Sequence, residues 1–246
     1  MKKRIKVICS DLDGTLLNSK KMVSKNNLEA IKKWQRKGNL FGITTGRSEP
    51  GVDMVVDEEM QPDFVICVNG ARVHQLSGMT KIHTLSNESV NTILKVMDQF
   101  SQNEYSLTIA GKSIWQKETP FINSKKNELV EKVSAKVAQA DNLKKILADL
   151  KLLPFNTTWS DSDYVEVVAN GVSKFSGLNE ALEEKVSIDE VAAIGDYEND
   201  LEIIKNVGLG VAVGNAIPKL KEQADLVVAD HDKDAIADLI DKLIND

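Results

Sequence analysis

Short runs of almost wholly apolar residues alternate, in the first and last thirds of the chain, with segments of helical periodicity. The first run is IKVICS (Ile5 to Ser10), a helical pattern extends from about Lys25 to Lys37, and the next runs are LFGITT and DFVICVNG. A strand with one solvated face would alternate polar and apolar side chains, so these uninterrupted runs favour strands buried on both faces. The pattern resumes after Gly171 with VAAIGD, LGVAV and ADLVVA. The chain is therefore predicted to build a parallel sheet covered by helices.

The pattern of apolar and polar residues changes in the middle of the chain. From about Arg72, RVHQ and KIHT flank a short turn, as in an antiparallel hairpin. Beyond it lie helical stripes from Ser86 to about Ser101 and from Asp141, a lysine-rich segment after KSIW that is interpreted as helical, and the strand pairs YSLTIAG with KSIW and FNTTWS with DYVEVVA. The predicted fold class is thus α/β, with a doubly wound parallel-sheet core of residues 1–82 and 173–246. An α+β domain of residues 83–172 is predicted to be inserted into it.

Composition narrows the classes of function. Hydrophobic residues make up 42% of the 246 residues, which suits a globular protein, and 37 acidic against 31 basic residues give a net charge of −6. Proteins that bind nucleic acid by neutralising phosphates carry a positive surplus, so no nucleic-acid partner is expected. No run approaches the roughly 18 apolar residues of a membrane span, so no membrane partner is expected.

The start of the chain and the cysteines bear on location. The basic start is followed by an apolar stretch too short for an export signal. Cys9 and Cys67 lie inside apolar runs, as buried thiols do, without a partner at disulfide-scaffold or metal spacing. A reducing cytoplasm is the expected location.

Polar side chains gather directly after the apolar runs. In open parallel sheets, ligands bind at the carboxyl ends of the strands, so these side chains form the candidate site. They are Asp11 and Asp13 after the first run, Thr45, Gly46 and Arg47 after the second, Asn69 after the third, Asp196, Asn199 and Asp200 after VAAIG, and Lys174 where the chain re-enters the core.

The carboxylates of this set would repel one another without a cation between them. Hard oxygen ligands with room for phosphate oxygens and water suit Mg²⁺, so Asp11, Asp13 and Asp196 predict a magnesium site. A carboxylate at a strand end can attack phosphorus as a nucleophile. A second carboxyl two residues on, with its pKa raised by the acidic neighbour, can protonate the leaving oxygen and then activate water. Thr45 and Lys174 supply donors for the phosphoryl oxygens, so each part serves phosphoryl transfer.

Four segments resemble, in order, the motifs of the haloacid dehalogenase superfamily. They are DLDGT, TTGR, the Lys of GVSKFSGLNEAL, and GDYENDLEIIK followed by GLGVAVGNA. Within the superfamily, the sequence is most similar to the Cof-type (class IIB) sugar-phosphate phosphatases, which carry a large α/β cap between the second and third motifs. The resemblance covers essentially the whole core, whereas the cap matches in position and style.

The resemblance implies an Mg²⁺-dependent phosphatase that hydrolyses small phosphorylated metabolites through an aspartyl-phosphate. By position, the resemblance implies that Asp11 is the nucleophile and Asp13 the general acid and base, and that Thr45, Gly46 and Lys174 bind phosphate. It implies that Mg²⁺ is held by the Asp11 carboxylate, the Asp13 carbonyl and Asp196, with support from Asp200. Asn199 would lie near phosphate or metal-bound water, and Arg47 and Asn69 would lie at the mouth between core and cap.

Two residues depart from the family pattern. Phe175 follows the motif Lys where the group usually has Gly, which puts the placement of Lys174 in doubt, and Tyr197 replaces a small residue and would narrow the entrance. The alternatives are a phosphomutase of the same superfamily, a phosphoacceptor protein that signals by shape, and a non-catalytic binding protein on this fold. A monomer or weak homodimer is expected.

Tryptophan and histidine residues receive structural interpretations. Trp34, Trp115 and Trp159 are predicted to pack, with contact to substrate as the alternative for the last two if they lie on the cap. The three histidines, among them His231 after the last apolar run, are predicted to have surface or hairpin roles and not to bind metal.

Overall fold

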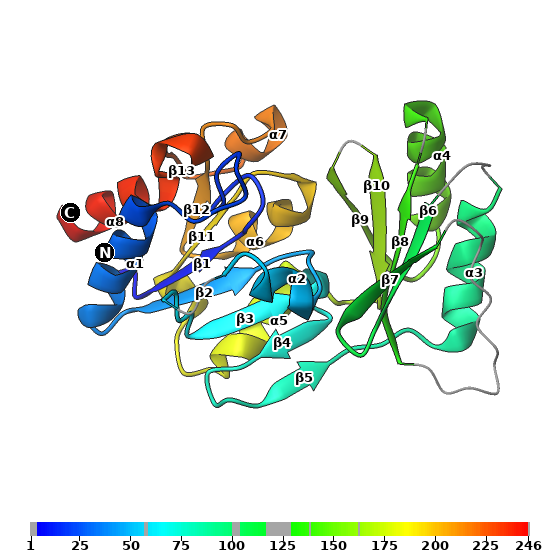
Figure 1. The fold of residues 1–246 in the computed structure, drawn as a ribbon, viewed down its shortest axis with the longest axis horizontal. Helices are drawn as coiled ribbons and strands as arrows, with labels where there is room; N and C mark the ends of the chain where they lie inside the picture. Colours follow the sequence, from blue (N-terminus) through cyan, green and yellow to red (C-terminus); the bar gives the residue numbers. More distant parts are fainter. Residues whose placement is uncertain are drawn as a thin grey trace.

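The computed structural model describes residues 4–56, 59–99, 104–116, 129–137, 139–161 and 163–245. Their strands form two separate sheets (Figure 1). The larger sheet has the strand order β13-β12-β11-β1-β2-β3-β4-β5. Its strands are β1 (Val7–Ser10), β2 (Leu40–Thr44), β3 (Phe64–Cys67), β4 (Arg72–His74), β5 (Thr80–Ile82), β11 (Val191–Gly195), β12 (Leu209–Ala212) and β13 (Leu226–Val227).

The strand β1 lies inside the larger sheet because its sequence leaves no side chain that needs water. All of its residues are fully buried. It pairs in parallel with β2 and β11, so that Val7 lies opposite both Leu40 and Val191. The remaining pairs from β13 to β3 are also parallel, whereas β4 and β5 form an antiparallel hairpin at one edge. The predicted α/β core and its hairpin are confirmed.

Helices pack in pairs beside the larger sheet. The helix α1 (Lys25–Arg36) packs against α8 (Ala235–Asn245), and α5 (Lys174–Leu182) packs against α6 (Leu201–Asn206). Ser24 caps the start of α1, because its side chain accepts a hydrogen bond from the Asn27 amide. The shorter elements are α2 (Glu49–Asp53), α7 (Pro218–Lys221), and the 3-10 turns η1 (Val68–Gly70), η2 (Ile188–Glu190), η3 (Glu198–Asp200) and η4 (His231–Lys233).

The smaller sheet is antiparallel and has the order β7-β6-β8-β10-β9. Its strands are β6 (Glu104–Ile109), β7 (Lys112–Gln116), β8 (Val130–Lys136), β9 (Asn156–Asp161) and β10 (Tyr164–Val168). The helices α3 (Asn87–Met97) and α4 (Ala140–Leu150) cover the face turned away from the larger sheet (Figure 1). These elements share an apolar core of their own. The residue boundaries 83 and 172 of the inserted domain stay a prediction.

The lysine-rich segment after KSIW contains a strand where the sequence analysis predicts a helix. Residues 117–128 lie outside the described part of the chain, and β8 follows between β6 and β10. Val133 and Ala135 are fully buried in the core under the helices, whereas Lys132 and Ser134 alternate with them toward the other face. The helix prediction is wrong for residues 130–136, because from Val133 on their buried apolar side chains recur at every second residue, which is the period of a strand.

A buried ion pair joins the two sheets beside the hairpin. Arg72 of β4 donates from Nε and Nη2 to the carboxylate of Glu131 in β8, at 3.0 and 2.6 Å. The amide of Gly111 donates to the same carboxylate at 2.8 Å. Glu131 has no exposed surface, so this contact fixes the smaller sheet on the larger one through a fully satisfied carboxylate.

Two further sequence expectations concern thiols and membranes. Cys9 and Cys67 are buried free thiols, as predicted. Within the described ranges, no helix has both the length and the apolar character that crossing a bilayer requires.

Candidate active site

A cleft of about 450 Å³ lies between the ends of the core strands and the open face of the smaller sheet. The core contributes side chains from the loops after β1, β2 and β11, and the smaller sheet contributes side chains from all five of its strands. Of the predicted site residues, the cleft is lined by Asp11, Asp13, Thr45, Gly46, Arg47, Asp196 and Asn199. Lys174, Asn69 and Asp200 lie directly beneath these residues, as the contacts below show.

The buried ammonium group of Lys174 bridges two carboxylates. Its Nζ donates to Oδ1 of Asp11 at 2.7 Å and to Oδ1 of Asp200 at 2.6 Å. Burial alone would lower the pKa of Lys174, but the charges of Asp11 and Asp200 outweigh it and raise that pKa, so the lysine stays protonated. Burial raises the pKa of Asp11 well above its usual range. The charge of Lys174 lowers this pKa in part, whereas the charges of Asp200 and Asp196 raise it further.

Phe175 does not displace the motif lysine. Lys174 is the first residue of α5, which Ser173 and Ser176 cap reciprocally. Gly70 permits the close approach of this turn, because a Cβ at Gly70 would lie 2.1 Å from the carbonyl oxygen of Ser173. The ring of Phe175 packs against the main apolar core. The doubt that Phe175 raises about the position of Lys174 is thereby removed.

Asp196 carries the least compensated charge in the cleft. Its contact with Thr15 Oγ1 is long, at 3.4 Å. Burial, followed by the charge of Asp200, raises the pKa of Asp196 to about 7. Gly14, with φ of +76°, lets the loop after β1 pass this carboxylate, because a Cβ there would lie 2.4 Å from Oδ2 of Asp196. The fold thus brings the first and fourth motifs into contact.

The donor set fits a hard divalent cation. Oxygen atoms of Asp11, Asp196 and Asp200 lie within 4.8 Å of one another. Both carboxylate oxygens of Asp200 already accept hydrogen bonds within the protein. Its Oδ1 accepts from Lys174, and its Oδ2 accepts from the amides of Asp196 and Tyr197 at 3.0 and 3.2 Å. Asp11 and Asp196 are therefore the carboxylates that would hold Mg²⁺, while Asp200 would orient its neighbours.

The structure corrects the expectation for the pKa of Asp13. Arg47 donates to it from Nε and Nη2 at 2.5 and 2.8 Å, and Lys21 donates at 2.8 Å. Burial would raise the pKa of Asp13, but these two cations outweigh burial and hold it at about 2. The predicted increase is wrong because it weighs the acidic neighbour in the sequence and omits two cations that tertiary structure supplies.

The loop after β2 presents polar groups beside these carboxylates. Thr45 Oγ1 accepts from the Arg47 amide at 3.1 Å, which leaves its hydroxyl proton for a ligand. Asn69, in a left-handed conformation with φ of 54°, donates its backbone N–H to the carbonyl of Thr45 at 2.9 Å. Its side-chain Oδ1 accepts from Asn199 at 3.2 Å. The segments that follow β2, β3 and β11 are therefore joined around Asn69.

The smaller sheet adds functional residues that the sequence analysis did not single out. Glu166 of β10 accepts from Asn69 at 2.9 Å and is ion-paired with Lys132 of β8, which also donates to the carbonyl of Gly46 at 2.6 Å. Burial would raise the pKa of Glu166, but the charge of Lys132 outweighs it and lowers that pKa. A single acidic residue inside the apolar run YVEVV is the sequence signal that could have identified Glu166. Nothing in the sequence around Lys21, the core residue that donates to Asp13, indicates a role at the site.

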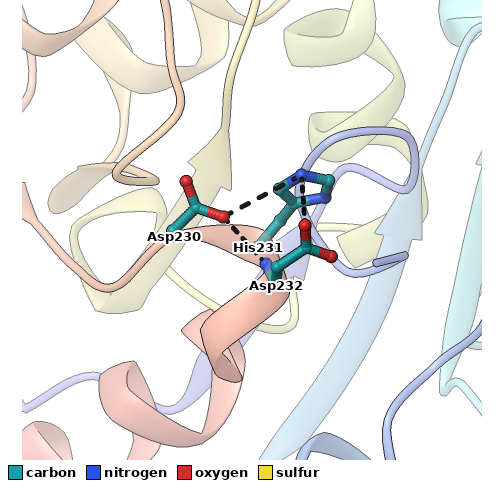
Figure 2. Close-up of side chains that lie close together, drawn as sticks. All are labelled: Asp230, His231 and Asp232. Carbon is teal, nitrogen blue, oxygen red and sulfur yellow. Dashed lines mark hydrogen bonds and ion pairs between the residues drawn. The ribbon is translucent and has the colours of Figure 1, made fainter. Parts of the chain in front are cut away.

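A second group of side chains of types that can bind metal lies at η4, and these side chains have structural partners (Figure 2). Asp230 accepts from the Asp232 amide at 2.9 Å, and Asp232 accepts from the amide and hydroxyl of Ser19 at 2.7 and 2.6 Å. His231 Nδ1 donates to the carbonyl of Leu17 at 2.8 Å. These contacts tie η4 to the loop that follows Asp13 and support the structural role predicted for His231.

Known proteins match the chain along most of its length. The family model of haloacid dehalogenase-like hydrolases matches residues 8–240. The chain is 30% identical to the chloroplastic endoribonuclease YBEY of Arabidopsis thaliana over 97% of its own length, but spans 46% of that protein. It is 29% identical to the 5-amino-6-(5-phospho-D-ribitylamino)uracil phosphatase YcsE of Bacillus subtilis, over 96% of this chain and 94% of the relative.

A solved structure shares the complete fold. The HAD subclass IIB sugar phosphatase BT4131 is 20% identical, with a TM-score of 0.82 over 96% of this chain and 98% of that one. The matches confirm the predicted superfamily, the fold with its inserted cap, and the prediction of a hydrolytic enzyme. The chain belongs to the haloacid dehalogenase-like hydrolase family.

Proposed function

We propose that the protein is an Mg²⁺-dependent phosphatase that hydrolyses phosphomonoesters of small metabolites through a phosphorylated Asp11. The observation that carries the proposal is the position of Asp11, whose carboxylate faces the cleft between the fixed cation Lys174 and the uncompensated carboxylate Asp196. Nothing in a purely structural core requires two acids at strand ends beside a buried lysine, because burying charges costs free energy.

The residues of the cleft have separate roles in the proposed reaction. Lys174 holds Oδ1 of Asp11 and so orients the carboxylate for attack on phosphorus. Thr45, through its free hydroxyl proton, and the backbone around Gly46 bind the phosphoryl oxygens as charge builds up on them. Bound Mg²⁺ would neutralise the carboxylates and polarise a phosphoryl oxygen.

Asp13 is proposed to protonate the leaving oxygen and then to deprotonate the water that releases phosphate. In the structure Arg47 and Lys21 keep it ionised, which suits the second step. For the first step, the phosphate of the substrate must draw Arg47 away, because an Arg–phosphate pair replaces the bidentate Arg47–Asp13 pair without loss of hydrogen bonds. Only Lys21 then still lowers the pKa of Asp13, so Asp13 carries a proton more readily.

The size of the cleft supports a substrate class. A volume of about 450 Å³ suits a small metabolite. The relative YcsE acts on a phosphate ester of a small ribitylamino-uracil, which supports a phosphorylated metabolite as partner for this chain too.

The test compares Asp11→Asn with wild type in the presence of Mg²⁺ on a panel of phosphate esters. The wild type is expected to release inorganic phosphate, and Asp11→Asn is expected to lose at least about a thousandfold in kcat because the nucleophile is removed. Asp149→Asn, an exposed residue of α4, is the matched control and should retain full activity. Equal rates for wild type and Asp11→Asn would refute the mechanism, and isomerised ester without free phosphate would identify a mutase.

A further inference from the structure

A second pocket, of about 390 Å³, lies outside the catalytic cleft, where β9 of the smaller sheet packs against η3 of the core. We refer to it as the side pocket. The smaller sheet supplies one wall, from β9 and the end of α4, and the core supplies the other, from η3 and α7. Among the described residues, the side pocket and the catalytic cleft share no lining residue.

Two polar atoms in the wall of the side pocket are buried without a hydrogen-bond partner. They are Oγ1 of Thr157 and Nε1 of Trp159, and neither has a partner in the part of the chain that the structure describes. Thr157 as a whole is only 9% exposed. Buried polar groups are nearly always paired, because an unpaired group has lost its water without replacement. Two such atoms in the wall of one pocket indicate a ligand that supplies the missing partners.

The two side chains lie on the same face of β9. Their partners in β10 are Val167 and Val165, which belong to the apolar core under the helices. Glu166, between these two valines, points to the opposite face and lines the catalytic cleft. Alternate residues of a strand lie about 7 Å apart, a distance that one group with two acceptor atoms can bridge. The side pocket is therefore a site on the helix-covered face, separate from the catalytic one.

Trp159 determines which kind of group the ligand must present. The ring packs against the core of the smaller sheet, as predicted, but its Nε1–H is a donor that cannot accept. Trp34 shows the usual arrangement, because its Nε1 donates to the carbonyl of Leu40 at 2.9 Å. The hydroxyl of Thr157 can donate as well. The ligand therefore presents acceptor atoms to this wall.

The charges around the side pocket favour an anion. Lys219 of α7 donates to both carboxylate oxygens of Glu198, at 3.1 and 3.2 Å, so these two charges compensate each other. Lys151, at the end of α4, is exposed and has no ion-pair partner among the described residues. The lining thus carries one uncompensated positive charge. A carboxylate matches this charge, and its two oxygens match the two unpaired donors. Leu147 adds apolar surface to the same pocket.

We propose that the side pocket binds a small organic carboxylate and thereby bridges the smaller sheet and the core. The carboxylate accepts from Trp159 and Thr157 beside Lys151, and the apolar body of the ligand packs on Leu147. The core wall of the pocket is η3, which also carries Asp200, the partner of Lys174. An occupied side pocket therefore ties the smaller sheet to a segment that supports the catalytic residues. This site does not depend on the phosphatase function proposed above.

The test titrates butyrate into the ¹⁵N-labelled full chain and follows the indole N–H resonances by NMR. The chain has three tryptophans, and Trp115→Phe and Trp159→Phe assign their signals. The Trp159 signal is expected to move downfield as its hydrogen bond forms, whereas the signal of Trp34, already paired, should stay in place. Trp115 is 48% exposed and lines the catalytic cleft, so its unchanged signal would show that butyrate does not bind there. Butyramide, the neutral analogue, should bind at least about tenfold more weakly.

Thr157→Val separates a role in binding from a role in stability. The substitution keeps the branched shape and removes a hydroxyl that has no partner, so Tm should not fall while the Kd of butyrate rises about tenfold. Thr108→Val is the matched control. Thr108 is also buried, but its hydroxyl forms a hydrogen bond with Ser113 at 3.0 Å, so this variant should lose stability and keep the Kd.

The charge is tested on α4. Lys151→Ala should raise the Kd of butyrate about threefold, because the pair is exposed to solvent. Lys145→Ala removes the same charge from the same helix away from the pocket and should leave the Kd unchanged.

The outcomes decide for or against the site. A Trp159 signal that stays in place throughout the titration refutes it, as does a shift of the Trp115 signal in its stead. An unchanged Kd in Thr157→Val refutes the pairing of the unpartnered donors, and equal binding of butyrate and butyramide refutes the anion. Release of phosphate enters none of these measurements, so the site can fail while the phosphatase function stands, and the reverse.

Discussion

Replacement of Lys174 by methionine probes the electrostatic centre of the site. The variant keeps the length and apolar stem of the side chain but removes the charge that Asp11 and Asp200 share. Lys174 is 2% exposed, so water cannot replace the lost ammonium group without opening the core. Two carboxylates would then remain buried without a counterion.

The magnitude follows from the two contacts. Each charge-assisted hydrogen bond, at 2.7 and 2.6 Å, contributes about 1.5–3 kcal/mol, and breaking a buried pair from one side costs about 3–5 kcal/mol. A loss of about 4 kcal/mol in the free energy of unfolding lowers Tm by roughly 8–16 °C for a chain of this size. The cost should be smaller at pH 5 than at pH 8, because Asp11, whose pKa is raised, accepts a proton at low pH and then no longer repels Asp200.

Thermal unfolding of metal-free protein at the two pH values measures this effect. Lys205→Met, an exposed residue of α6, is the matched control and should shift Tm by less than about 2 °C. A Lys174→Met protein as stable as wild type at pH 8, or equally destabilised at pH 5 and pH 8, would show that the lysine does not compensate these carboxylates.

Asp13→Asn should lower kcat for a sugar phosphate about 10²- to 10⁴-fold, and much less for p-nitrophenyl phosphate, whose leaving group needs no proton. Equal losses on the two esters would remove Asp13 from the acid step. Mg²⁺ should raise Tm more at pH 8 than at pH 6, because the pKa of Asp196 is about 7 in the metal-free protein. The sign follows from linkage: a carboxyl with a raised pKa contributes stability that is full below pH 3.8 and is lost as pH rises through 7, and bound Mg²⁺ offsets the ionised form. Scanning fluorimetry with and without Mg²⁺ checks this, with Asp196→Asn as the variant that should lose the gain; an equal Mg²⁺ effect at both pH values would contradict it.

The predictions from sequence were strongest where one physical constraint acts along the chain. Apolar runs without polar alternation favour strands covered on both faces, so β1 and the parallel character of the core were predictable. The lysines of β8 misled because Lys132 is buried through contacts with Glu166 and Gly46, which are distant in sequence. The place of Glu166 in the cleft was not predicted for the same reason, because its partners are distant from it in the sequence.

The sequence by itself determined the parallel core, the inserted α+β unit and the set of polar residues at strand ends, because strand ends and motif order are local properties of a chain. Tertiary structure alone decided the charge state of Asp13, which depends on Arg47 and Lys21, and it turned Trp115 toward the cleft. A pKa depends on every charge within a few ångströms, and exposure depends on which elements pack together. Local sequence determines neither the charge state of Asp13 nor the exposure of Trp115, so only the folded structure shows them.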